Sequence, residues 1–285
     1  MPGTPNIDFF NLSFIYNCQK IMDKILQRSS GKIDIEFSNN NFKKNFQSGC
    51  CKILNPNSYN SNNELVLINT AGGITCNDKI EINALVEKSK LSICTQAAEK
   101  VYAGIGDPAK VDINITLNNS NLYWLPKELI LFNNSKLDRK ININLSNNSN
   151  LIFCETSIFG RKAMSEQINN LSFFDQWKIY INSSLKHFEA INIKGSFNDN
   201  YNNDYSFANK SSLSTILIFG EIIHQLESEL TNIINNTDNH YCEMTKFDDK
   251  IIIRSLADDN YYLKKTLNYI FNNIMHDKLP KNWDL

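Results

Sequence analysis

The chain is organised around Leu91-Ser-Ile-Cys-Thr-Gln-Ala-Ala-Glu-Lys-Val-Tyr-Ala-Gly-Ile-Gly106. A loose repeat surrounds this stretch, because Ser-x-Leu begins at Ser89, Ser120, Ser135 and Ser149, so that the last two intervals are 15 and 14 residues. The last three copies read Asn-Asn-Ser-x-Leu, which is a turn signal followed by the first apolar residue of a strand. The repeat therefore predicts strands of similar length that are joined by similar turns.

The first interval of the repeat is roughly twice as long as the others, and residues 95–102 fill the difference. This segment is polar and helix-prone, since it contains Gln96, two alanines, Glu99 and Lys100. One interpretation is that the interruption was placed in the β scaffold to carry a function. The other is that it is an ordinary long connection.

Alternation of apolar and polar residues predicts many β-strands from about residue 32 to about residue 195. A clear case is Val111-Asp-Ile-Asn-Ile-Thr-Leu117, and similar patterns occur at 33–36, 80–83, 141–145 and 177–181. Each of these strands has one apolar face. We expect the strands to curl or coil on themselves, because this buries the apolar faces together.

The pattern changes after residue 212. Residues 215–219 read as a strand, and apolar spacing then predicts helices over about 221–235 and 259–275, with two short strands between them. The predicted fold class is α+β and mainly β, with a large coiled or solenoid-like β body and a C-terminal part that contains two helices. We divide the chain into an N-terminal extension (1–26), the β body (27–212) and a C-terminal strand-helix-strand-strand-helix region (213–285) packed on it.

Composition limits the class of protein. The chain has 285 residues, 42% of them hydrophobic, with 29 basic and 30 acidic side chains and a net charge of −1. This balance disfavours nucleic-acid binding, which needs a basic surface. No segment is apolar for long enough to cross a membrane, so we expect a soluble cytoplasmic protein.

The seven cysteines include no C-x-x-C pair and disfavour a zinc site. Asn is abundant and follows no period, which we interpret as compositional bias.

Known catalytic and nucleotide-binding motifs are either absent from this sequence or stand in the wrong structural context. Gly104-Ile-Gly106-Asp-Pro-Ala109 fits G-x-G-x-x-G/A, but a strand rather than a helix follows it, so we predict a loop instead of a dinucleotide site. G-x-x-x-x-G-K-[ST], H-E-x-x-H and G-x-S-x-G are absent. Several charged residues do stand among apolar ones. Glu155 follows the apolar run 151–153, and it either pairs with Arg161 or faces water in a channel.

At these positions the chain resembles the UreD family of urease accessory proteins, called UreH in some organisms. The resemblance covers about residues 27–285. The most specific block is Thr-Gln-Ala-Ala-Glu-Lys-Val-Tyr, which contains Thr95, Gln96, Glu99, Lys100 and Tyr102. Before it, Asn69-Thr-Ala-Gly-Gly contains Gly72 and Gly73. The blocks after it contain Trp124 and Pro126, then Gly160 and Arg161, and finally Arg254 and Pro280…Trp283. The chain departs from the family pattern at Cys76-Asn77, Lys127 and Ser165, which affects local loop geometry.

The resemblance implies a non-enzymatic maturation factor. Such a protein binds apo-urease and a helical adaptor, UreF, which in turn docks a P-loop GTPase, UreG, and together they deliver Ni²⁺ to the urease active site. The chain would then be a nickel-insertion chaperone that holds no tightly bound cofactor and carries Ni²⁺ in transit. The absent P-loop agrees with this division of labour, because the nucleotide chemistry belongs to a partner.

Nickel in transit must be held weakly, and scattered carboxylates suit this better than a His/Cys cage. Our hypothesis is that Asp78, Glu99, Glu128, Glu155 and Glu166 line a hydrated path through the β body. The alternative is that these side chains form structural ion pairs. Two other function classes stay open, namely a metal-independent scaffold that only clamps urease open and a hydrolase built on a β-solenoid.

Overall fold

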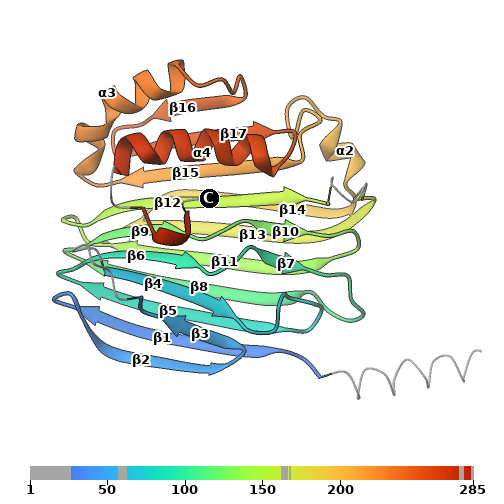
Figure 1. Cartoon of the computed structure of the whole chain (residues 1–285), viewed down its shortest axis with the longest axis horizontal. Helices are drawn as coiled ribbons and strands as arrows, with labels where there is room; N and C mark the ends of the chain where they lie inside the picture. The colour runs from blue at the N-terminus through green and yellow to red at the C-terminus, as the bar shows by residue number, and fades with distance from the viewer. Residues whose placement is uncertain (1–26, 57–62, 162–165, 167, 276–278, 284–285) are drawn as a thin grey trace, which may run out of the picture.

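The computed structural model describes residues 27–56, 63–161, 166, 168–275 and 279–283. Two β-sheets face each other in it (Figure 1). The seven-stranded sheet A contains β1 (Ser30–Ser38), β2 (Asn41–Gly49), β5 (Lys79–Glu87), β8 (Ala109–Asn118), β11 (Lys136–Leu145), β13 (Asn170–Ile181) and β14 (Ser184–Ser196). The ten-stranded sheet B contains β3 (Cys51–Leu54), β4 (Asn63–Asn69), β6 (Lys90–Thr95), β7 (Glu99–Val101), β9 (Asn121–Leu125), β10 (Leu129–Leu131), β12 (Asn150–Phe159), β15 (Ser212–Phe219), β16 (Cys242–Lys246) and β17 (Lys250–Ala257).

The chain winds between the two sheets as a coil. It passes from β5 to β6, from β8 to β9 and from β11 to β12, and the successive strands within each sheet pair in parallel. The register aligns like residues, so that Ile113 lies beside Ile82 on one side and Ile141 on the other. The inward-facing residues of both sheets form the main hydrophobic core. The predicted mainly β fold with a coiled body is confirmed.

The Ser-x-Leu repeat marks strand starts, as predicted, since β6, β9, β11 and β12 each begin one residue after its serine. Ser89, Ser120 and Ser149 also stack on one another. The backbone N–H of Ser89 donates to Oγ of Ser120 at 3.2 Å, and that of Ser120 donates to Oγ of Ser149 at 3.2 Å. These buried hydrogen bonds hold three successive coils in register.

Many asparagines occupy specific structural positions, so compositional bias alone does not explain their abundance. Asn119 and Asn134 precede repeat serines with φ of 48° and 60°, a conformation that Asn tolerates better than most residues. On sheet A, the amide of Asn142 donates to Asn114 at 3.1 Å, and that of Asn114 donates to Asn83 at 3.1 Å. Asparagine therefore serves both the turns and a ladder across parallel strands.

The interrupting segment 95–102 is not helical, although its composition suggested a helix. β6 ends at Thr95, a bend follows, and β7 then pairs in parallel with β10. The N–H of Gln96 donates to the carbonyl of Leu67 at 2.8 Å, and that of Glu99 to the carbonyl of Glu128 at 2.9 Å. Leu67 of β4 and Glu128, just before β10, thus accept hydrogen bonds from N–H groups that a helix would pair internally. The predicted loop at 104–109 is confirmed, because β8 begins at Ala109.

The C-terminal part extends sheet B and covers its outer face (Figure 1). β15 pairs antiparallel with β12, β17 with β15 and β16 with β17. Helices α3 (Ile222–Asn235) and α4 (Asn260–Met275) confirm the two predicted helices, and their apolar faces form a second hydrophobic cluster with sheet B. A short α2 (Asn198–Tyr201) and the 3₁₀ turn η3 (Lys281–Trp283) complete the elements.

Antiparallel strands stand at both ends of the parallel coil. In sheet A, β2 and β14 pair antiparallel with β1 and β13, and in sheet B the antiparallel neighbours are β3 at one end and β15 at the other.

The division into three regions stays a prediction, and its N-terminal extension lies outside the described residues. No helix in the described ranges is long and apolar enough to cross a membrane.

Candidate functional site

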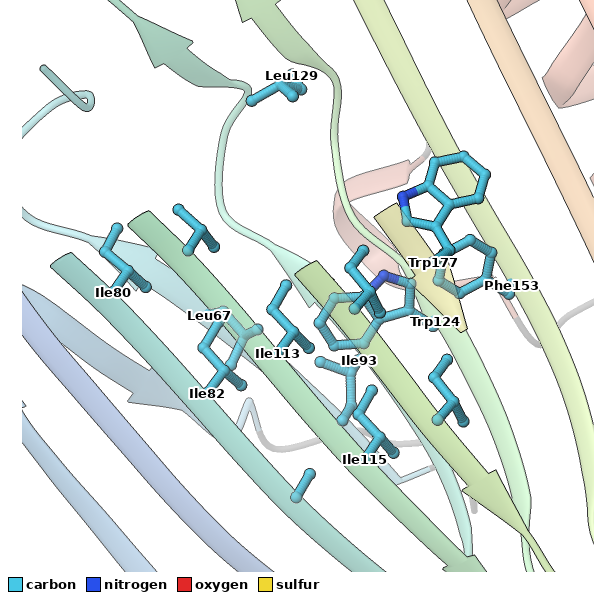
Figure 2. Close-up of a cluster of buried hydrophobic side chains, with 14 of the residues drawn as sticks. Leu67, Ile80, Ile82, Ile93, Ile113, Ile115, Trp124, Leu129, Phe153 and Trp177 are labelled. Atoms are coloured by element: carbon cyan, nitrogen blue, oxygen red, sulfur yellow. The ribbon is translucent and has the colours of Figure 1, made fainter. Parts of the chain in front are cut away.

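A cavity of about 580 Å³ lies between the two sheets. Its walls are mostly apolar side chains from both sheets, part of which Figure 2 shows, including Ile82, Ile113 and Trp124. The cavity reaches the surface at the motif segment, because Gln96, Ala97 and Lys100 line it and are exposed. The segment that interrupts the repeat therefore forms part of the cavity rim.

Three charged side chains form a buried triad at the wall of this cavity. Arg139 on β11 pairs with Glu155 on β12 at 2.8 Å (Nη1 to Oε2) and with Asp175 on β13 through Nε at 2.9 Å and Nη2 at 2.6 Å. The indole Nε1 of Trp124 donates to Oε1 of Glu155 at 2.7 Å. All three charged side chains are buried. The triad joins sheet A to sheet B and carries one more carboxylate than it has cations.

The local electrostatics follow from burial. Burial raises the pKa of Glu155, and the charge of Arg139 opposes this effect. Burial alone would lower the pKa of Arg139, but the two carboxylates outweigh it and raise the pKa. Arg139 therefore stays charged, and burial disfavours the ionised form of Glu155.

Glu99 is the second carboxylate at the cavity. The amide Nδ2 of Asn69 lies 3.1 and 3.2 Å from its two oxygens. Burial raises the pKa of Glu99 to about 7, while the hydrogen bond from Asn69 acts in the opposite direction. A carboxyl group with this pKa exchanges its proton near neutral pH.

The other three carboxylates of the predicted path have separate partners. Asp78 accepts the backbone N–H groups of Ser29 at 2.7 Å and Thr75 at 2.8 Å, and does not line the cavity. Glu128 pairs with Lys264 of α4 at 3.0 Å, in a small adjoining pocket of about 20 Å³. The structure thus brings Glu99 and Glu155 to one cavity, with Glu128 beside it.

Glu166 lies apart from the cavity and forms a partly exposed ion pair with Arg161 at 2.8 Å. The pairing of Glu155 with Arg161 that the sequence suggested is therefore wrong, because Arg139 holds Glu155 instead. Within the described ranges, no three His, Cys, Asp or Glu side chains are grouped so that they could hold a metal ion. The cavity offers oxygen donors singly, and it does not form a closed cage.

Other residues of the family-like motifs pack near the same rim. A Cβ placed on Gly73 would lie 2.4 Å from the ring of Tyr102, so only glycine allows this ring to approach the backbone. The Tyr102 ring meets Phe132 edge to face at 5.0 Å, and the guanidinium of Arg161 lies 4.4 Å from the Phe132 ring centroid. Gly160 precedes Arg161 with φ of +85°, a conformation that favours glycine.

Sequence reasoning missed Arg139, which holds Glu155, and Asp175, which holds Arg139. A signal was available, because both residues stand at inward positions of alternating strands. Arg139 lies between Leu137 and Ile141, and Asp175 between Phe173 and Trp177, all of which are buried. A charged residue in the apolar phase of a strand is either paired or costly.

The fold and the site define a class: a β-coil protein with carboxylates along an internal cavity and two covering helices. Comparison with known families is more specific. The family model described as UreD urease accessory protein matches residues 29–282. This chain belongs to the UreD family of urease accessory proteins, which confirms the resemblance seen in its motifs.

Curated relatives agree with this assignment. The chain is 31% identical over 224 residues to a urease accessory protein UreD of Chelativorans sp., covering 78% of this chain and 80% of that protein. It is 30% identical over 243 residues to the protein of the same name from Agrobacterium fabrum, covering 84% of each, and 31% identical to that of Roseobacter denitrificans, covering 84% and 87%. These relatives are named as accessory proteins and not as enzymes.

Proposed function

We propose that this protein is a non-enzymatic urease maturation factor of the cytoplasm. In this role it binds apo-urease and acts with the helical adaptor UreF and, through it, the P-loop GTPase UreG. It helps to deliver Ni²⁺ to the urease active site as a nickel-insertion chaperone. Membership of the UreD family supports the accessory role. The absence of a P-loop from the sequence agrees with nucleotide hydrolysis by a partner.

One observation carries the proposed nickel path: Glu99 and Glu155 line the same cavity. Glu128 extends the path, because its small pocket shares Pro126 and Lys127 with the larger one. Ni²⁺ is the cargo, and isolated carboxylate oxygens with water would bind it weakly enough to release it. Each carboxylate retains lone pairs beyond its present hydrogen bonds. Asp78 and Glu166 are not part of this narrower path.

The test is urease activation at limiting nickel with Glu99→Gln and Glu155→Gln variants. Glu166→Gln is the matched control, because it removes a carboxylate charge away from the cavity. We expect both cavity variants to fold and to bind apo-urease normally, to support poor activation at limiting nickel and to recover at high nickel. The control should activate urease as the unmodified chain does.

The metal-independent scaffold makes the opposite prediction. If the protein only holds urease open, both cavity variants will activate urease fully at limiting nickel with normal binding. The hydrolase alternative needs an exposed groove with paired carboxylates, whereas the cavity here lies between two sheets. Purified protein without partners should hydrolyse neither urea nor GTP, and turnover of either would contradict the accessory role.

The adaptor surface is proposed on the outer side of α4. The inner faces of α3 and α4 are buried against sheet B, but Tyr261, Tyr262 and Tyr269 of α4 remain exposed. Aromatic side chains of this kind are enriched at protein interfaces. Co-expression with the adaptor should raise soluble yield, and Tyr262→Ser with Tyr269→Ser should abolish this gain. Tyr205→Ser, at an exposed tyrosine outside α3 and α4, should not.

A further inference from the structure

Two adjacent cysteines, Cys50 and Cys51, direct their sulfur atoms to the same place. A Cβ placed on Gly31 would lie 2.2 Å from Sγ of Cys51 and 2.8 Å from Sγ of Cys50. Neighbouring side chains of an extended strand point to opposite faces. Here the turn between β2 and β3, with Gly49 at φ of +61°, brings both sulfurs over Gly31. The two thiols therefore lie close together.

The backbone around the pair is fixed on both sides. The N–H of Cys50 donates to the carbonyl of Ser30 at 3.0 Å. The carbonyl of Cys50 accepts from the N–H of Thr70 at 2.8 Å and from its hydroxyl at 3.0 Å. The convergence of the sulfurs thus belongs to the architecture of this turn, which several hydrogen bonds hold.

The two thiols differ in their access to solvent and in their acidity. Cys50 is half-buried, whereas Cys51 is buried and lines the cavity between the sheets. Burial raises the pKa of Cys51 to about 12. Burial also raises the pKa of Cys50, but a hydrogen bond with Cys51 opposes the rise. Cys50 is therefore the thiol that a reagent in solution reaches first, and the Cys51 sulfur lies close enough to react with the modified Cys50.

We propose that Cys50 and Cys51 form a dithiol modification site that a peroxide closes to a vicinal disulfide. The Cys50 sulfur attacks one peroxide oxygen, giving a sulfenic acid and a molecule of water. The Cys51 sulfur then displaces the hydroxyl group from Cys50 as a second water and forms the S–S bond. Two thiols and one hydrogen peroxide thus give one disulfide and two waters, with sulfur oxidised and peroxide oxygen reduced.

Such a bond should be easy to reverse. Cα atoms of adjacent residues are about 3.8 Å apart, which is below the usual range of roughly 4.4–6.8 Å across a disulfide. A bond outside this range is strained, and strained disulfides are reduced more readily than structural ones. Because Cys51 lines the cavity, its oxidation would also change the cavity wall. This inference is independent of the proposed nickel path.

The test treats the purified full chain with hydrogen peroxide, unfolds it in denaturant with an alkylating agent so that buried thiols are blocked as well, and maps the peptides by mass spectrometry. We expect a mass lower by two hydrogen atoms, two fewer alkylated cysteines, and a peptide in which Cys50 and Cys51 are joined. Excess glutathione should restore both thiols. Cys50→Ser and Cys50→Ala should each abolish the change, and Cys76→Ser should leave it intact.

Three results would overturn the proposal. One is over-oxidation of Cys50 to a sulfinic or sulfonic acid while Cys51 remains a free thiol that the agent alkylates. Another is a disulfide between either residue and a different cysteine, and the third is a full set of alkylated thiols after peroxide treatment. Circular dichroism of the two Cys50 variants checks that the fold is retained, and their agreement separates a loss of the thiol from a loss of structure.

Discussion

Arg139 and Glu155 belong to opposite sheets, and the 2.8 Å ion pair between them ties the two walls of the cavity together. Asp175 holds the same guanidinium from the neighbouring strand of sheet A. Because the site is buried, removal of the cation and removal of one carboxylate should have very different consequences.

Arg139→Met should destabilise the protein far more than Glu155→Gln does. Breaking a buried pair by removing one partner typically costs about 3–5 kcal/mol, and Arg139→Met leaves two carboxylates without a cation. Glu155→Gln leaves Arg139 paired with Asp175 and replaces one charged acceptor by a neutral one, at about 1 kcal/mol. Urea denaturation measures both losses, and equal losses would contradict this account of the triad.

Glu99 should make stability depend on pH between about 4.5 and 7. Burial raises its folded pKa above the unfolded value, so the native state binds more protons than the unfolded state in this window. Stability therefore falls as pH rises from 4.5 to 7, by at most about 3.4 kcal/mol at 1.36 kcal/mol per pKa unit. Above pH 7 the contribution is constant.

Glu99→Gln isolates this effect, because Gln keeps the shape and does not titrate. The difference in unfolding free energy between this variant and the unmodified chain should change across pH 4.5–7, with the variant relatively more stable at pH 8. A difference that stays flat with pH would mean that Glu99 has an ordinary pKa. Glu166→Gln, at a partly exposed ion pair, is the control for general charge effects.

Gly72 and Gly73 give a matched comparison of backbone strain with steric clash. Both have φ in the range that favours glycine, at +76° and +153°. Gly72→Ala meets nothing within 4 Å, so it should cost only the conformational penalty of about 1–2 kcal/mol. Gly73→Ala also clashes with the Tyr102 ring and should cost a further ~1–3 kcal/mol.

The measurement is the midpoint of urea denaturation for both alanine variants, alone and in a Tyr102→Ala background. Tyr102→Ala should relieve part of the loss caused by Gly73→Ala, because the ring is gone, while the carbonyl of Lys100 at 2.8 Å remains. It should leave the loss caused by Gly72→Ala unchanged. Equal behaviour of the two glycines would show that the ring contact is unimportant.

Trp283 should anchor the C-terminal turn to the β body. Its ring packs edge to face on Phe271 at 5.1 Å, and its Nε1 donates to the carbonyl of Leu125 at 2.8 Å. Trp283→Ala should cost about 3–5 kcal/mol, as for other buried tryptophans. Trp283→Phe keeps an aromatic ring but leaves that carbonyl unpaired, at about 1–3 kcal/mol. Thermal and urea denaturation should rank the variants in this order.

Much of the fold could be predicted because the signals are local. Period-2 alternation located β1, β5, β8, β11 and β13 of sheet A, and Asn-Asn-Ser-x-Leu located the starts of β9, β11 and β12. The central strands of sheet B are buried on both faces and therefore show no alternation. The stacking of Ser89, Ser120 and Ser149 could not be read in advance, because it depends on how successive coils align. The segment 95–102 was misread for a related reason. Its hydrogen-bond partners are strands distant in sequence, and these override a weak helix propensity.

The candidate site was predicted only in part. Glu99 and Glu155 stand out as acidic residues in family-like motifs, and both lie at the cavity. The sequence offers Arg161, six residues away, as one possible partner of Glu155, whereas Arg139 reaches Glu155 from the opposite sheet. Such contacts follow from the path of the coil, and nearness in sequence does not reveal them.

The antiparallel strands at both ends of the coil fix its length. An open parallel coil presents unpaired strand edges that another copy could extend, as in fibre-forming assemblies. Here the parallel order stops at β2 and β3 at one end. At the other end it stops at β14 in sheet A and at β15, β17 and β16 in sheet B, which all pair antiparallel with their neighbours. A duplicated coil could be added in the middle of the chain, but not at either end without displacing a cap.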